Sequence, residues 1–269
     1  MKIYSDILIL ILNTWRTNMD VLRRWFIGDM GTPGAYEYTA MHFITIACVV
    51  VGVAICAILG ANKRISDKSK RKIIVGIAIF QLAFEVFWRI IYITIKKAPW
   101  VELYPMYPCN LNGILLPLAV LFDNKVMKKM FYLFGFIGGV LTFVMPDGIF
   151  CTSVMVFPIL KSILQHTGLL FIPVFEYASK KYIPNIKDFG WCFLGTLLHF
   201  INCEVIDLHV LGLTGDYMFY RSGLPFVIPG VSQYITLTVF GAIVMALILL
   251  ISDIKVTKEL FKKLSKKGK

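Results

Sequence analysis

The chain has 269 residues, of which 58% are hydrophobic and 16% are charged, and its mean hydropathy is +0.73. A soluble domain of this length needs more polar surface, so the composition indicates a polytopic membrane protein. The net charge of +12 does not indicate nucleic-acid binding, because the Lys and Arg residues form short blocks between apolar segments, as loops that set membrane topology do.

The first 39 residues precede the first long apolar segment. Residues 7–15 (ILILILNTW) are apolar but too short to cross a bilayer, and no small-residue cleavage site follows them. We therefore expect residues 1–39 to stay in the mature protein and to form an interfacial segment on the membrane surface.

Seven apolar segments follow, at residues 40–61, 73–95, 109–123, 130–146, 154–178, 189–212 and 228–252. They predict an all-α membrane bundle of about seven transmembrane helices over residues 40–252. With the N-terminus outside, 19 Lys and Arg residues fall inside and 7 fall outside, which predicts an inner C-terminus. The basic tail, residues 253–269, is then expected at the anionic inner surface of the cell membrane.

The six cysteines, at positions 48, 56, 109, 151, 192 and 203, have neither CxxC nor zinc-site spacing. We therefore expect no metal site and no cofactor. Cys109 and Cys151 would face the same side of the membrane, but their spacing does not argue for a disulfide.

Several predicted spans carry polar side chains, and an ionisable group near the bilayer centre costs about 2.5–3.5 kcal/mol. Glu85 and Arg89 are four residues apart, so they share a helix face and can form an ion pair. The fifth span contains Lys161, Gln165 and His166, and the sixth has a polar face with His199, Asn202, Cys203, Glu204 and Asp207. In the predicted orientation these groups lie where they can converge on one cavity. The alternative for His42, His199 and the Glu85–Arg89 pair is a structural role between helices.

Residues 107–122 (YPCNLNGILLPLAVLF) place polar residues at the start of a short apolar helix. Pro108 suits the first helical turn, and Cys109 follows where unpaired N–H groups and the helix dipole favour a thiolate. A nearby histidine could accept the thiol proton, and an asparagine amide could hold an oxyanion. The alternative is a small residue packed at a tight helix mouth.

A series of motifs runs through residues 40–250. They are ExxxR (Glu85, Arg89), PxxCNL (Pro105, Cys109–Leu111), Pro117, MPD (Met145–Asp147), QHTG (Gln165–Gly168), Asn202 and GDYMF (Gly215–Phe219). In this order they resemble the YwaF-type bacterial integral membrane family, which is similar to a eukaryotic cysteine-dependent transmembrane phospholipid acyltransferase. Tyr107 replaces a histidine of the bacterial family, and Asp216 replaces its asparagine.

The resemblance implies a membrane acyltransferase, or an acyl hydrolase, that works through an acyl-thioester on Cys109 with His166 as the base. It implies membrane lipids as partners, with an amphiphilic acyl donor and acceptor. The expected substrate contacts are Asn110, Asn202, Glu85, Arg89, Gln165, Tyr107, Asp216 and Tyr217. The alternative is a transporter or binding protein for a small charged solute, with Glu85, Arg89, Lys161, Glu204 and Asp207 in its cavity. A receptor is suggested only by the number of spans.

Overall fold

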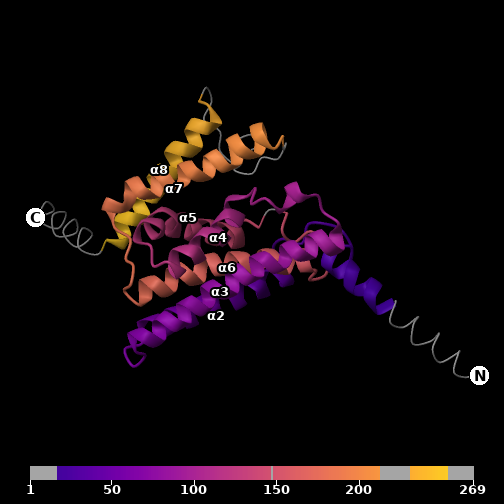
Figure 1. Cartoon of the computed structure of the whole chain (residues 1–269), viewed down its shortest axis with the longest axis horizontal. Coiled ribbons are helices and arrows are strands. Elements are labelled where there is room, and N and C mark those ends of the chain that lie inside the picture. The colour runs from indigo at the N-terminus through magenta and orange to yellow at the C-terminus, as the bar shows by residue number, and fades with distance from the viewer. Residues whose placement is uncertain (1–16, 147, 213–230, 254–269) are drawn as a thin grey trace, which may run out of the picture.

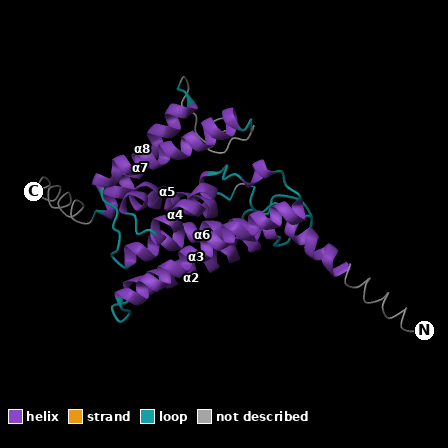
Figure 2. Cartoon of the chain, in the orientation of Figure 1, coloured by secondary structure: helices purple, strands orange, loops and turns teal. Residues whose placement is uncertain are grey.

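The computed structural model describes residues 17–146, 148–212 and 231–253. Helices and loops make up this part of the chain, with one isolated β-bridge between Pro33 and Thr152 (Figure 2). After a helix over residues 17–27, the elements are α2 (Ala40–Ala61), α3 (Asp67–Ile91), the π-helix η1 (Tyr92–Lys96), the 3-10 helix η2 (Trp100–Leu103), α4 (Pro108–Leu121), α5 (Lys125–Val144), α6 (Phe157–Ala178), the 3-10 helix η3 (Ile186–Asp188), α7 (Phe189–Phe200), the π-helix η4 (Ile201–Val210) and α8 (Gln233–Ser252).

Five helical segments in the described residues are long and apolar enough to cross a membrane: Ala40–Ala61, Asp67–Lys96, Lys125–Val144, Phe157–Ala178 and Ile186–Ile206. Two shorter apolar helices, Pro108–Leu121 and Thr238–Ser252, add to them. A helix thus lies in each of the seven predicted segments, and the prediction of a multi-pass α-helical membrane protein is confirmed. That all seven cross the bilayer stays a prediction.

The chain ends are described in part. The helix over residues 17–27 leaves Met19, Val21 and Leu22 exposed, and its placement at a membrane surface stays a prediction. Residues 1–16 and the predicted basic tail from residue 254 onward lie outside the described part of the chain.

Helix α4 lies at the centre of the bundle, in contact with α3, α5 and α6 (Figure 1). Leu116, Ala119 and Val120 of α4 are fully buried and pack in one cluster with Ala78 of α3 and Ile172 of α6. Because other helices surround it, α4 needs neither a lipid-facing side nor the length of a spanning helix, and its 14 residues are enough.

Ion pairs connect α5 with α6, with η3 and with the loop after α4 at the end of the bundle where α4 terminates. The Lys128 ammonium lies 2.7 Å from Asp123 and 2.9 Å from Glu176, and the Lys129 ammonium lies 2.9 Å from Asp188. The hydrogen bond from Lys128 holds the pKa of Asp123 below its ordinary value. Arg71 of α3 also donates a hydrogen bond to the Leu121 carbonyl at the end of α4.

These contacts bring together the start of α3 and the loops after α4 and α6, as alternating spans require. The same loops carry much of the positive charge that predicts the inner side of the membrane. Which side they face in the cell stays a prediction.

Helices α7 and α8 lie side by side and diverge from the other helices toward one end of the molecule (Figure 1). The sixth predicted segment is α7 followed by the ten-residue π-helix η4, where an α-helical polar face was expected. In η4, Asn202, Cys203 and Glu204 are buried although they are consecutive. The wider π-helical turn brings neighbouring residues onto a common face, and such helices are frequent at functional sites.

Candidate functional site

Cys109 lies in the first turn of α4. Tyr107 is the N-cap, and its carbonyl accepts hydrogen bonds from the backbone N–H groups of Asn110 and Leu111. Pro108 occupies the first turn, as predicted. The positive end of the helix dipole at this position offsets part of the cost that burial imposes on a thiolate.

Lys161 of α6 is the cation of this site, although the sequence analysis gave it no role beside Cys109. Its ammonium donates a hydrogen bond to Asn110 Oδ1 over 3.2 Å and lies 4.4 Å from the centre of the Trp88 ring. It also interacts electrostatically with the Cys109 sulfur and with Glu85. Burial disfavours a thiolate, and a neighbouring ammonium offsets part of that cost.

The predicted Glu85–Arg89 ion pair is present in α3. Arg89 Nη1 lies 2.6 Å from Glu85 Oε2, and Trp88 Nε1 donates to the same oxygen over 2.8 Å. Arg89 Nε donates to the Leu103 carbonyl over 3.0 Å, which ties α3 to the loop that leads into α4. Among the described atoms, Glu85 Oε1 and Arg89 Nη2 are buried without a hydrogen-bond partner. These contacts fit the structural role of the pair, and its predicted contact with a substrate stays a prediction.

Gly113 allows α3 and α6 to approach α4 one turn beyond Cys109. A Cβ atom at Gly113 would lie 2.6 Å from Glu85 Oε1 and 3.0 Å from Gln165 Nε2. Gln165 Nε2 also donates to the Cys109 carbonyl over 3.3 Å. The missing side chain of Gly113 thus lets both predicted substrate contacts reach the helix that carries the thiol.

Gly113→Ala is expected to destabilise the protein by about 1–3 kcal/mol, because the added methyl group meets a carboxylate and an amide that are already packed. Gly138→Ala is the matched control, since a Cβ atom at this glycine of α5 meets nothing within 4 Å. The control should be neutral or stabilising by up to about 1 kcal/mol through helix propensity. Thermal unfolding in detergent measures both, and equal midpoints would mean that the approach at Gly113 is not tight.

His166 lies on a different side of α6 from Gln165. Its Nδ1 donates to the Ser162 carbonyl over 2.7 Å, and its ring makes an edge contact with Phe143 of α5. This bond leaves Nε2 as the ring nitrogen that can act as a base. No hydrogen bond among the described residues joins His166 to Cys109, so the predicted dyad is not formed in this arrangement and its role stays a prediction.

Two other predicted histidines have structural contacts. His42 accepts a hydrogen bond from the Tyr38 backbone N–H at Nδ1 and contacts the Phe143 carbonyl through Nε2. His199 donates from Nδ1 to the Gly195 carbonyl and stacks on Phe134 with 4.4 Å between ring centres. These contacts fit the structural alternative that the sequence left open for both.

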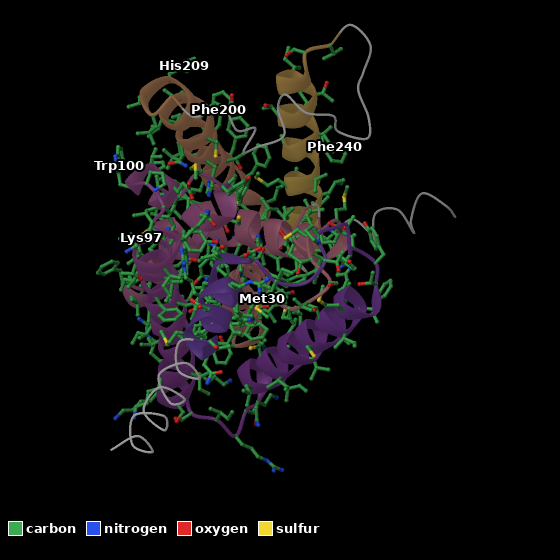
Figure 3. All side chains as sticks on the ribbon, turned by 90° about the vertical axis from the view of Figure 1, so that its right-hand side faces the viewer. Met30, Lys97, Trp100, Phe200, His209 and Phe240 are labelled. Carbon is green, nitrogen blue, oxygen red and sulfur yellow. The ribbon has the colours of Figure 1, made fainter. Side chains whose placement is uncertain are left out.

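The π-helix η4 fixes the loop in front of Cys109. Asn202 accepts a hydrogen bond from the Tyr104 hydroxyl over 2.7 Å and donates to the Pro105 carbonyl over 2.9 Å, and Cys203 Sγ donates to the Met106 carbonyl. Both ends of the Asn202 amide are therefore engaged, so it positions the loop. Figure 3 looks onto this side of the molecule, where Lys97 and Trp100 lie, with His209 at the end of η4.

Of the three remaining predicted site residues, the structure describes only Tyr107. Tyr107 precedes Cys109 and is 45% exposed. Asp216 and Tyr217 lie outside the described residues, as does the side chain of Asp207. All six cysteines are unpaired, and the described residues contain no group of three or more His, Cys, Asp or Glu side chains arranged to hold a metal ion.

Comparison with known proteins yields one match. The model of a family described as the TMEM164 family matches residues 37–252, which is most of the chain and includes every helix from α2 to α8. No curated protein and no solved structure matches.

Proposed function

The chain belongs to the TMEM164 family, a family of transmembrane proteins; we propose that it is an acyltransferase of membrane lipids with Cys109 as its nucleophile. The observation that carries the proposal is the surroundings of the thiol. Lys161 of α6 donates a hydrogen bond over 3.2 Å to Asn110, the residue next to Cys109 at the start of α4, so an ammonium lies near the sulfur inside the helical bundle. A cation near a thiol stabilises the thiolate that a nucleophilic reaction requires.

The resemblance of the chain to a cysteine-dependent phospholipid acyltransferase supports the same chemistry. By the order of the motifs, the catalytic Cys and His of that protein would fall on Cys109 and His166. Membrane lipids reach the site because the helices that form it lie in the bilayer, so the proposed acyl donor is a phospholipid or a related amphiphile. The acceptor is a second amphiphile with a free hydroxyl group.

In the proposed reaction, His166 Nε2 takes the thiol proton and the Cys109 sulfur attacks the ester carbonyl carbon of the donor. The ester C–O bond then breaks, the acyl group remains on sulfur as a thioester, and the leaving alkoxide takes the proton back from His166. The acceptor hydroxyl next gives its proton to His166 and attacks the thioester. Breaking the C–S bond releases the acylated product, and the proton returns to the sulfur. Water in place of the acceptor gives hydrolysis.

The neighbours of Cys109 supply charge stabilisation for these steps. The Cys109 backbone N–H at the start of α4 and the side-chain amides of Asn110 and Gln165 are the donors proposed for the oxyanion. The Ser162 carbonyl fixes the tautomer of His166. Catalytic hydrogen bonds often tighten only when substrate binds, so the proposal requires His166 and Cys109 to come within reach in the substrate complex.

The proposal is tested by reconstituting the purified protein in liposomes that contain a phospholipid with one deuterated acyl chain and a lysophospholipid acceptor. Mass spectrometry should detect the deuterated chain on the acceptor, and a thioester adduct on the peptide that contains Cys109. Deuterated free fatty acid without acylated acceptor would identify a hydrolase. Absence of all three products, together with solute-dependent protection of several sites from labelling, would favour the transporter.

Lys161→Met is expected to lower the transfer rate about 100-fold, because it removes the cation beside the reacting sulfur. Lys161→Arg keeps the charge and should restore part of the rate. Alkylation of Cys109 by iodoacetamide should require a higher pH in Lys161→Met than in the wild type, a change that loss of packing alone would not cause. Lys97→Met, at an exposed lysine near the same end of the bundle, is the control. Equal alkylation profiles in Lys161→Met and the wild type would remove Lys161 from the mechanism.

A further inference from the structure

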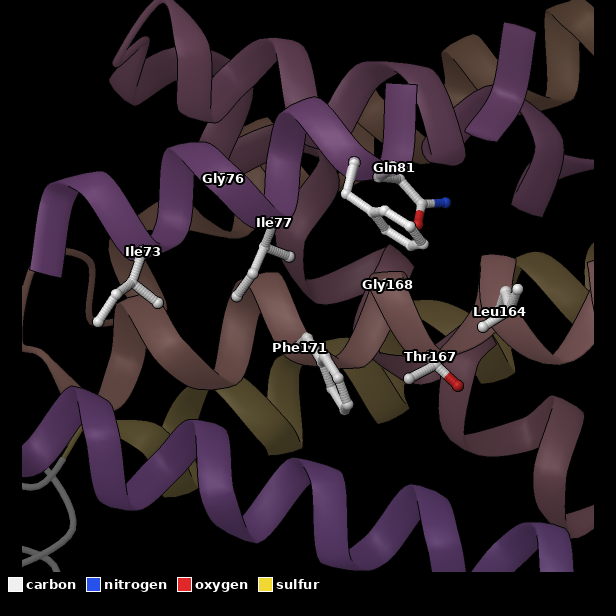
Figure 4. Close-up of a pocket in the computed structure, with 9 residues that line it drawn as sticks. Ile73, Gly76, Ile77, Gln81, Leu164, Thr167, Gly168 and Phe171 are labelled. Carbon is white, nitrogen blue, oxygen red and sulfur yellow. The ribbon is translucent and has the colours of Figure 1, made fainter. Parts of the chain in front are cut away.

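A groove of about 430 Å³ lies between α3 and α6 (Figure 4). Its lining is mostly apolar and comes from these two helices: Ile73, Gly76, Ile77, Phe80 and Gln81 of α3, and Leu164, Thr167, Gly168 and Phe171 of α6. Phe80 is 57% exposed, so the groove opens on the surface of the bundle. The lining runs over residues 73–81 of α3 and 164–171 of α6, which corresponds to a length of about 10–12 Å.

Two glycines shape the groove. A Cβ atom at Gly76 would meet nothing within 4 Å, so its missing side chain leaves open space along α3. At Gly168 the two helices come close, and the Gln81 amide lies directly against this glycine. Gln81 also donates a hydrogen bond to the Gln165 carbonyl, and it is the last lining residue along α3, at one end of the groove. Gln81 and Thr167 are the polar side chains of the lining, so this end is the polar one.

The polar end of the groove leads to Cys109. Along α6, Lys161 lies one turn beyond Leu164, and Gln165 bonds to the Cys109 carbonyl. Along α3, Glu85 and Trp88 follow Gln81 at helical spacing, and Trp88 lies under the Lys161 ammonium. The seam between the helices therefore changes in order from hydrocarbon side chains, through two amides, to the Lys161 ammonium beside a thiol.

We infer that this groove holds the acyl chain of the lipid donor, with the ester at the Gln81–Gln165 end. Both bordering helices are long and apolar enough to span the membrane, so acyl chains are the molecules that meet the opening. The order of hydrocarbon, amides and the Lys161 ammonium along the seam matches the order of alkyl chain, ester and phosphate in a phospholipid. The inference that the ester lies at the Gln81–Gln165 end rests on the proposed function, whereas the binding of an acyl chain in the groove does not.

The experiment measures lipid contact without turnover. Protein carrying Cys109→Ala is reconstituted in phosphatidylcholine liposomes with a trace of phosphatidylcholine that bears a diazirine in one acyl chain, irradiated, and digested. Mass spectrometry then maps the adducts. We expect adducts on the groove residues of α3 and α6 in excess over those on Val50 and Val51, which are exposed on α2.

Gly76→Leu fills the groove from a position with free space and should reduce the groove adducts about tenfold, the effect of displacing about two buried methylene groups. Gly138→Leu is the matched control, because this helical glycine of α5 also has free space but does not border the groove. Ile77→Trp, with Ile79→Trp as its control on the exposed side of α3, repeats the test with a larger side chain.

Groove adducts no more frequent than those on α2, or unchanged by both filling variants, would overturn the inference. Groove adducts that respond to Gly76→Leu, found with a wild-type protein that transfers no acyl chain, would keep the lipid groove and reject the proposed function. Acyl transfer by the wild-type protein, together with a groove that shows no adducts, would keep the proposed function and reject the lipid groove.

Discussion

Cys109→Ala is expected to reduce acyl transfer by at least about 1,000-fold, because it removes the atom that carries the acyl group between donor and acceptor. The remaining amides and Lys161 can still polarise an ester, but without sulfur no thioester forms. Cys109→Ser tests the same point more strictly, since a hydroxyl in this position keeps the shape and is a far weaker acid than a thiol. Both variants are measured in the liposome assay with the deuterated donor.

The fold should survive this substitution. The only side-chain hydrogen bond of the Cys109 sulfur in the described residues is a weak one, 3.9 Å to Asn110 Oδ1. Cys151→Ala is the control, because Cys151 is exposed and lies in a loop near the same end of the bundle. An unchanged unfolding midpoint with lost transfer supports the nucleophile. Full transfer by folded Cys109→Ala refutes it.

Lys128→Met should destabilise the protein by about 3–5 kcal/mol, the cost of leaving a buried charge without its partner. The Lys128 and Glu176 side chains are only 4% and 2% exposed, so water cannot replace the lost ammonium at Glu176. Lys96→Met removes an ion pair with Glu102 whose partners are 42% and 38% exposed, and should cost at most about 1 kcal/mol. Thermal unfolding in detergent compares the two.

The double variant Lys128→Met with Glu176→Met separates the lost ion pair from lost packing. If the uncompensated carboxylate causes the instability, replacing it with an apolar side chain should recover most of the loss. A double variant as unstable as the single one would show instead that the shape of the lysine side chain matters at the junction of α4, α5 and α6.

The local features of this protein were predictable from the chain because they depend on nearby residues. Hydrophobic segment length places the helices, Pro108 marks the start of α4, and four-residue spacing sets Glu85 beside Arg89. Lys161 shows the limit. Its position in an apolar segment indicated that it needs a partner, but the partners, Trp88, Asn110 and Cys109, come from α3 and α4, which no spacing connects to α6.

The sequence pattern could also not predict how each helix is rotated about its axis, or where an α-helix changes to a wider π-helix. Gln165 and His166 are neighbours in the chain, and sequence alone could not show that Gln165 contacts α4 while His166 faces Phe143 of α5. The π-helix η4 replaces an expected α-helical face because its polar side chains bond to a loop almost a hundred residues earlier. The groove between α3 and α6 depends on Gly76 and Gly168, whose effect on its shape arises only when the two helices pack together.

The recessed start of α4 has a consequence for access. Asn110 meets Lys161 at the level of Trp88, and the α3–η1 helix continues for eight residues to Lys96, so Cys109 lies about 10 Å inside that end. A charged thioester or thiol reagent that comes from water would have to lose its hydration shell to reach this depth, whereas an apolar molecule can reach Cys109 laterally from the lipid. Substrates and inhibitors would then both enter the site from within the bilayer.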